Sequence, residues 1–208
     1  MSKQVTVAIL VASALLMSGN AFAVVKDIIV DVRPASLLVN WSADDFKARG
    51  PVEFRNRAEY EEIEQPNSVS TIPNLKLGVG IDTGSAYVDL TGGAGLLVND
   101  RFRSMMLDVD GAYQYKFQKN VLFGPHIGLA YYPAPDWYGD ADIEFSDSMG
   151  AMFGLQLSVG FDILFTFAID YAYIQPFDVD SVAEGWEVSD DSVDFSGLLF
   201  QFGMKGRF

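Results

Sequence analysis

The sequence of 208 residues predicts an all-β fold: a closed, antiparallel, up-and-down transmembrane β-barrel of eight strands. Three observations predict it. From about Pro51 onward, large apolar residues occupy alternate positions, which is the period of a β-strand. Short turns join most of these segments with their apolar faces in register. The chain also begins with a segment typical of exported proteins and ends on Phe208.

Seven segments show the alternation clearly. In residues 161–175, every odd position from Phe161 to Tyr173 is large and apolar, while the even positions are mostly small or polar. Because the side chains of a strand point alternately to its two faces, each such segment predicts one strand. The seven segments are 75–82, 86–98, 103–117, 121–131, 149–159, 161–175 and 198–208.

The turns test this assignment, because residues that flank a hairpin turn must face the same side of the sheet. Three short turns join residues that both lie on the apolar face, and a fourth gives a weaker match. The flanking pairs are Ile81 with Ala86, Phe117 with Val121, Val159 with Ile163 and, most weakly, Val98 with Arg103. The predicted strands are therefore consecutive hairpins.

The position of the eighth strand is left open between two segments. Residues 51–62 alternate apolar residues with charged ones and are one candidate. Residues 27–41 compete as a first strand, although Pro34 and doubled apolar residues interrupt their period. The polar segments 63–70, 133–147 and 178–191 are predicted to be loops.

The N-terminus predicts export. Lys3, an apolar run at residues 5–17 and the small residues Ala21 and Ala23 are typical of a signal peptide cleaved after residue 23. Residues 24–208 then form one domain, in which 24–50 is either a lead-in or the first strand. The absence of cysteine excludes a disulfide-stapled scaffold and a lipoprotein anchor. A net charge of −14 argues against nucleic acid as a partner.

Side-chain volume predicts that the apolar face points outward. The interior of an eight-stranded barrel is just wide enough for side chains to fill, and the Phe, Tyr, Leu and Ile of this face are too bulky for it. The opposite face is rich in small residues. Aromatic residues also gather at the two ends of the strands, as in the interfacial girdles of membrane barrels. The predicted girdle residues are Tyr113, Tyr115, Phe117 and Phe161 at the turn end, and Tyr131, Tyr171 and Tyr173 at the loop end.

With these features, residues 51–208 resemble the small eight-stranded outer-membrane barrels of Gram-negative bacteria, of the OmpA, OmpX and OmpW type. In that group the last strand ends in an aromatic residue with a glycine five residues earlier, which Phe208 and Gly203 match. Gly206 and Phe202 depart from the usual pattern. The resemblance implies a location in the cell outer membrane, contact with its lipids and lipopolysaccharide, and insertion by the barrel-assembly machinery with periplasmic chaperones.

The inward face carries charges of both signs, which predict a salt-bridge network that plugs the lumen, because buried charges must be paired. The alternative is a narrow, porin-like channel whose charges select small solutes or ions. The predicted network comprises Glu53, Arg55, Arg57, Glu59, Lys76, Asp89, Asp108, Asp110, Lys116, His126, Asp162, Asp170, Lys205 and Arg207.

His126 is the only histidine and raises the alternative of a lipid-A-modifying enzyme, but no recognisable catalytic triad accompanies it. The acidic loops do not have the spacing of an EF-hand and are expected to be solvated surface. Trp137, Tyr138 and Trp186 in these loops are candidate contacts for lipopolysaccharide or a partner. The sequence therefore predicts a monomeric, non-enzymatic outer-membrane barrel with a structural or surface-interaction role and no cofactor or metal.

Overall fold

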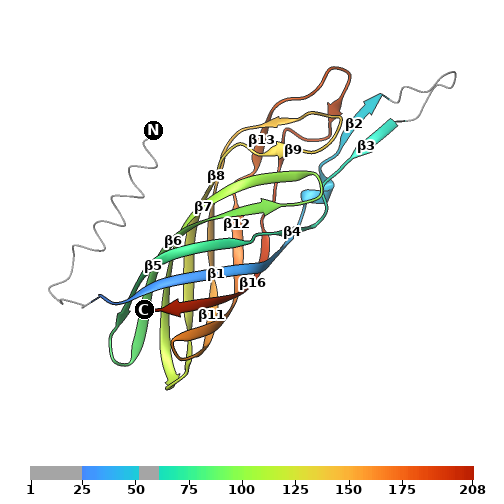
Figure 1. The fold of residues 1–208 in the computed structure, drawn as a ribbon. Coiled ribbons are helices and arrows are strands. Elements are labelled where there is room, and N and C mark those ends of the chain that lie inside the picture. The colour runs from blue at the N-terminus through green and yellow to red at the C-terminus, as the bar shows by residue number, and fades with distance from the viewer. Residues whose placement is uncertain (1–24, 52–60) are drawn as a thin grey trace.

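The computed structural model describes residues 25–51 and 61–208 (Figure 1). Eight long antiparallel strands form a closed barrel wall, and β1 closes it by pairing with both β5 and β16. The wall strands are β1 (Val25–Asn40), β5 (Asn74–Asp82), β6 (Ala86–Val98), β7 (Phe102–Gln118), β8 (Val121–Tyr132), β11 (Ser148–Gly160), β12 (Ile163–Ile174) and β16 (Gly197–Arg207). The predicted fold class is confirmed.

Consecutive wall strands pair as hairpins. Val98 pairs with Arg103 across the short connection between β6 and β7, as predicted. The start of β1 and the end of β16 meet at the turn end of the barrel, where Ile28 and Phe208 exchange two backbone hydrogen bonds of 2.8 and 3.0 Å. Phe208 therefore takes part in closing the sheet.

The first wall strand is β1, which pairs with both β16 and β5. Of the two candidate segments, residues 27–41 are therefore the correct one, and residues 51–62 are not a wall strand. The pairing of β1 with β16 shifts register between Val32 and Ala35. Asp31 and Arg33 point inward before this bulge, and Ser36 points inward after it. Because of the extra residue at Pro34, the side chains that point into the barrel occupy odd positions before the bulge and even positions after it. This change interrupts the two-residue period of the sequence.

Residues 1–23, predicted to be a signal peptide, and residues 52–60 lie outside the described residues. On either side of residues 52–60 lie two short strands, β2 (Ala48–Pro51) and β3 (Glu61–Glu64). These two strands pair with each other, and β2 also pairs with β14 (Glu187–Val188), so that the three form a separate sheet. Figure 1 shows β2 and β3 extending beyond the rim of the barrel.

The outer and inner faces of the wall differ as the volume argument predicts. Large apolar side chains lie on the outer face, such as Phe117 with 68% and Phe165 with 67% of their surface exposed. Charged and amide side chains of the same strands are buried inside, including Lys76, Asp89 and Gln156. Within residues 25–51 and 61–208, no helix combines the length and hydropathy needed to span a bilayer.

The segments between the wall strands at the loop end are more ordered than predicted. They contain a 3-10 helix (Ala43–Asp45) and several short strands: β4 (Val69–Thr71), β9 (Asp136–Trp137), β10 (Glu144–Phe145), β13 (Phe177–Ser181) and β15 (Ser192–Val193). β4 bridges β1 and β6, and β9 pairs with β7. The second separate sheet has the order β10-β13-β15.

These segments bury an apolar core that we call the loop cap. It comprises Phe46, Phe102, Trp137, Ile143, Phe145, Phe177, Val193 and Phe195, and it is continuous with inward apolar residues of the wall such as Leu38, Met106 and Leu199. The ring centroid of Phe102 lies 4.5 Å from that of Phe195 and 4.9 Å from that of Phe177. The acidic side chains of these loops are exposed, as expected. The loops are not simply extended, however, because apolar residues spaced among the acidic ones pack together at the end of the barrel.

Candidate functional site: the lumen and the loop cap

The turn end of the lumen holds a cationic cluster. Lys205 Nζ lies 2.8 Å from Asp89 Oδ2, and Arg207 Nη2 lies 3.3 Å from the same oxygen. The guanidinium of Arg207 stacks over the Tyr87 ring at 3.9 Å, and Lys116 Nζ lies 4.6 Å from this ring. Lys116 also pairs with Asp82 at 2.5 Å. Ion pairs and cation–π contacts together occupy this mouth of the barrel.

Arg33 organises the next part of the lumen. Its guanidinium pairs with Asp31 at 2.9 Å and donates hydrogen bonds to Gln201 Oε1 at 2.5 Å and to Gln156 Oε1 at 3.1 Å. These partners come from β1, β16 and β11, so one side chain connects three strands across the interior. Sequence reasoning missed Asp31 and Arg33, although the alternation at residues 27–33 was a signal for them.

Lys76 and His126 form the next cluster toward the loop cap. Lys76 Nζ pairs with Asp110 and, at 2.5 Å, with Asp108 Oδ2. The His126 ring lies between two carboxylates, with Nδ1 3.0 Å from Asp170 and Nε2 3.4 Å from Asp110. Gln201 Nε2 donates to Asp170 at 2.7 Å, which links this cluster to Arg33. A connected polar network thus runs along the lumen.

Glycines in the wall allow these pairs to form. In register, Gly93 of β6 lies between Lys76 and Asp108, and Gly154 of β11 lies between His126 and Asp170. A Cβ on Gly93 would lie 2.7 Å from Lys76 Cγ, and one on Gly154 would lie 2.5 Å from Asp170 Oδ1. The missing side chains let charged groups on the flanking strands meet across the middle strand.

The remaining residues predicted for the network fall in two places. Glu53, Arg55, Arg57 and Glu59 lie outside the described residues. Asp162 does not join the network: it is exposed in the turn between β11 and β12, where its carbonyl accepts a hydrogen bond from the Arg207 N–H at 2.9 Å. Its prediction as a lumen charge followed from extending the alternation through a turn, where the period no longer holds.

The predicted girdle and assembly residues lie at the surface and at the closing strand. Tyr113, Tyr115, Phe117, Phe161, Tyr173 and Phe208 are exposed, and Tyr131 and Tyr171 are partly buried. Gly203 has an additional role inside the wall, because a Cβ there would lie 2.8 Å from Arg33 Cγ. Its position therefore also leaves room for Arg33 to cross the lumen.

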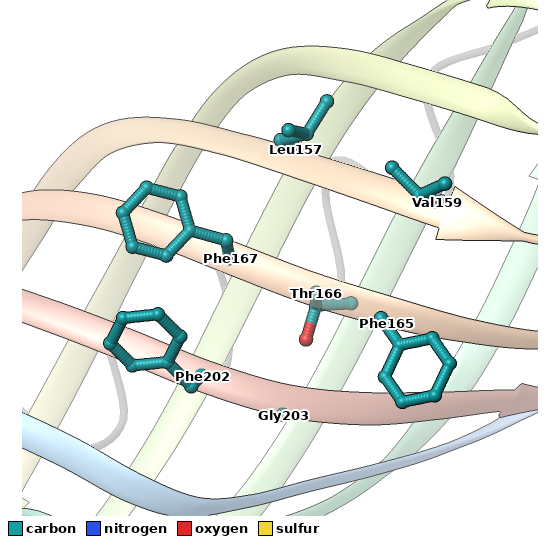
Figure 2. Close-up of a pocket in the computed structure, with 7 residues that line it drawn as sticks. All are labelled: Leu157, Val159, Phe165, Thr166, Phe167, Phe202 and Gly203. Atoms are coloured by element: carbon teal, nitrogen blue, oxygen red, sulfur yellow. The ribbon is translucent and has the colours of Figure 1, made fainter.

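One hollow on the outer wall, of about 290 Å³, is lined by Phe165, Phe167 and Phe202 together with Leu157 and Val159 of β11. Figure 2 shows these side chains. Another, of about 600 Å³, is lined mainly by apolar residues that include Tyr113, Ile127 and Phe153, and also by His126. Most of the aromatic and aliphatic side chains around both belong to the exposed outer face, which suits contact with lipid chains.

Glu64 is a buried carboxylate that holds the loop cap to β3. Its oxygens accept hydrogen bonds from Trp137 Nε1 at 2.8 Å, from the Asp140 N–H at 2.8 Å and from the Ala141 N–H at 3.4 Å. Arg101 lies 3.5 Å away. Trp137 is only 8% exposed, so the prediction that it offers a surface contact is wrong, because its ring packs in the cap. Tyr138 is exposed and Trp186 is partly buried.

Replacing this carboxylate should loosen the cap. In Glu64→Ala, the indole N–H of Trp137 and two backbone N–H groups lose their acceptor, at a cost of about 2–3 kcal/mol of local stability. We expect tryptic cleavage near Arg101 to be at least tenfold faster in detergent micelles. Glu184→Ala, which removes an exposed carboxylate, is the control and should leave the rate unchanged. Equal rates for the two variants would contradict this role of Glu64.

No protein-family model and no curated protein matches the chain. Solved structures do resemble it. Neisserial surface protein A is 12% identical, with 87% of this chain and 97% of that chain covered and a TM-score of 0.49. The outer membrane protein OprG of Pseudomonas aeruginosa is 12% identical, with 88% of this chain and 96% of that chain covered and a TM-score of 0.44. Ail of Yersinia pestis is 11% identical, with 88% of this chain and 98% of that chain covered and a TM-score of 0.34.

At these identities and TM-scores, the fold of the present chain rests on its own strand pairing and not on the likeness. That pairing closes eight antiparallel strands into a barrel with an apolar exterior. The predicted resemblance to small outer-membrane barrels is confirmed at the level of architecture.

Proposed function

We propose that this chain is an integral protein of the Gram-negative outer membrane with a non-conducting lumen and a structural or surface-interaction role. Two sets of contacts support the proposal. Buried ion pairs lie inside the barrel from Arg207 to Asp108, and the aromatic side chains of the loop cap pack together at the loop end.

The surroundings of His126 support a non-enzymatic role. Both ring nitrogens face carboxylates, those of Asp110 and Asp170, and the ring is 3% exposed. A general base needs a nucleophile or a water within hydrogen-bond reach and access to substrate. A histidine held between two buried carboxylates suits pairing within the lumen better than attack on a lipid.

Biogenesis follows from the same proposal. The signal peptide predicted at residues 1–23 would direct export, and periplasmic chaperones and the barrel-assembly machinery would insert the chain through the strand that ends at Phe208. The outer-face hollows and the aromatic residues at both ends of the wall would then contact lipid and lipopolysaccharide. The barrel is proposed to act as a monomer.

Conductance in a planar bilayer tests the closed lumen. The purified, folded protein should give no discrete current steps, because passage would require separating buried ion pairs and the cap. Heat-modifiability on a gel, with and without boiling, shows in parallel that the inserted sample is a folded barrel. Reproducible unit conductance from such a sample would contradict the closed lumen and favour the narrow-channel alternative.

A further inference from the structure

The small sheet β14-β2-β3 is separate from the barrel wall, and Figure 1 shows β2 and β3 beyond the barrel rim. β14 and β3 both pair with the central strand β2, so each is an edge strand of this sheet in the described chain. Glu62, Ile63 and Gln65 are exposed on β3 or directly after it. An exposed edge strand presents unpaired backbone groups to any extended chain that reaches it.

The direction of these groups follows from the pairing. The Ser189 N–H donates to the Lys47 carbonyl at 2.8 Å, so the backbone groups of Lys47 face β14, and by alternation those of Ala48 face β3. Ala48 pairs with Glu64, and Gly50 pairs with Glu62. The N–H and C=O of Ile63, between Glu62 and Glu64, must therefore point away from β2, toward the open edge.

The two faces of β3 have different chemistry. On one face, carboxylate oxygens of Glu62, Glu64 and Asp140 lie within 4.8 Å of one another, and Arg101 lies 3.5 Å from Glu64. On the other face, Ile63 has 50% of its surface exposed. A strand added to this edge would be stabilised by a cation on the first face and an apolar side chain on the second.

A second copy of this chain does not fit that requirement. If two β3 strands paired antiparallel about Ile63, Glu62 of one copy would lie opposite Glu64 of the other. Like charges directly opposite each other destabilise a pair of strands. The edge therefore favours a different protein with positive charge over self-association.

We propose that the edge of β3 binds an extended segment of another protein, in which Lys or Arg alternates with apolar residues, as an added β-strand. Backbone hydrogen bonds to Ile63 supply the pairing, and the carboxylates of Glu62 and Asp140 select the basic side chains. This inference deepens the surface-interaction role proposed above and rests on it, because the edge must face the cell exterior to meet such a partner.

The test uses the full protein in detergent micelles and a labelled synthetic peptide in which Lys and Val alternate, with binding measured by fluorescence anisotropy. Ile63→Pro removes the outward N–H while leaving the pairing with β2 intact, since proline is tolerated at an edge position whose N–H faces away from the sheet. We expect affinity to fall about tenfold, the equivalent of one lost hydrogen bond of about 1.4 kcal/mol. Ile63→Val should bind as the unaltered protein does.

A second measurement does not depend on the protein variant. A peptide N-methylated on the residues that would face β3 keeps its charge but cannot donate to the edge, and it should bind at least tenfold more weakly. Glu62→Gln should weaken binding and reduce its salt dependence, because one carboxylate fewer attracts the lysines.

The proposal is overturned if the methylated peptide binds as well as the parent, which would show attraction to charge alone. It is also overturned if an alternating Glu/Val peptide binds equally well, or if Ile63→Pro instead abolishes a dimer seen by sedimentation. Heat-modifiability of the same samples is independent of these outcomes. A heat-modifiable barrel that binds no peptide would refute the edge proposal, whereas a protein without the heat shift would refute the proposed function.

Discussion

Lys76→Met is expected to destabilise the folded barrel by about 3–5 kcal/mol, because it leaves two buried carboxylates without their cation. Lys76 is fully buried and pairs with Asp108 and Asp110 from β7, across the intervening strand β6. The urea midpoint of the protein in detergent micelles, followed by tryptophan fluorescence, should fall clearly. The temperature at which the heat-modified gel band appears should fall as well.

The control is Lys116→Met. Lys116 makes a similar contact with Asp82 at 2.5 Å, but the two side chains are 25% and 19% exposed at the mouth of the lumen. Solvent screens such a pair, so we expect a loss of less than about 1 kcal/mol. Adding Asp110→Asn to Lys76→Met should recover part of the loss, since it removes one unpaired charge. Equal midpoints for Lys76→Met and Lys116→Met would contradict a buried network in the lumen.

Phe102→Ala is expected to cost about 3–5 kcal/mol of stability in the loop cap, the usual range for removing a buried aromatic ring. Phe102 is fully buried, and its ring centroid lies within 6 Å of those of Phe145, Phe177 and Phe195. The cap is a core of apolar side chains at the loop end of the barrel, and burial from water stabilises it. Limited proteolysis should therefore cut the loop segments of this variant much faster while the wall strands stay protected.

Tyr138→Ala provides the comparison, because Tyr138 lies in the same loop region with 46% of its surface exposed. Its removal should leave loop cleavage nearly unchanged. If Phe102→Ala instead changed cleavage no more than Tyr138→Ala, the aromatic cluster would not hold the cap together. Phe102→Leu conserves most of the apolar volume, so its rate of loop cleavage should lie between those of Phe102→Ala and Tyr138→Ala.

The alternation of the sequence predicted most of the wall because the two faces of each strand meet different surroundings. The outer face carries large apolar residues, and the narrow lumen accommodates small residues or paired polar ones. This constraint is local and repeats every second residue, so it can be read without knowing which strands are neighbours. It failed at Pro34, where the bulge changed the phase, and it placed Asp162 inside although that residue lies in a turn.

The lumen network shows what the pattern could and could not predict. The inward charge of Lys76, Asp110, His126 and Asp170 followed from alternation, but their partners did not. Those partners depend on register across three strands, and on Gly93 and Gly154 between the charged positions. A glycine on the inward face of a strand can therefore help to predict such pairs from sequence, because charged side chains of the two flanking strands can meet across it.

By itself, the sequence determined the barrel, the direction of its two faces and the charged character of its lumen, because these follow from the period of the strand and the volume of side chains. Only the tertiary structure decided that β1 is the first strand, that Arg33 crosses the lumen and that Phe102, Trp137 and Phe177 join in a loop cap. Those features arise between residues far apart in the chain. Apolar residues scattered through acidic loops have no period, so their burial depends on the three-dimensional packing of the loops against one another.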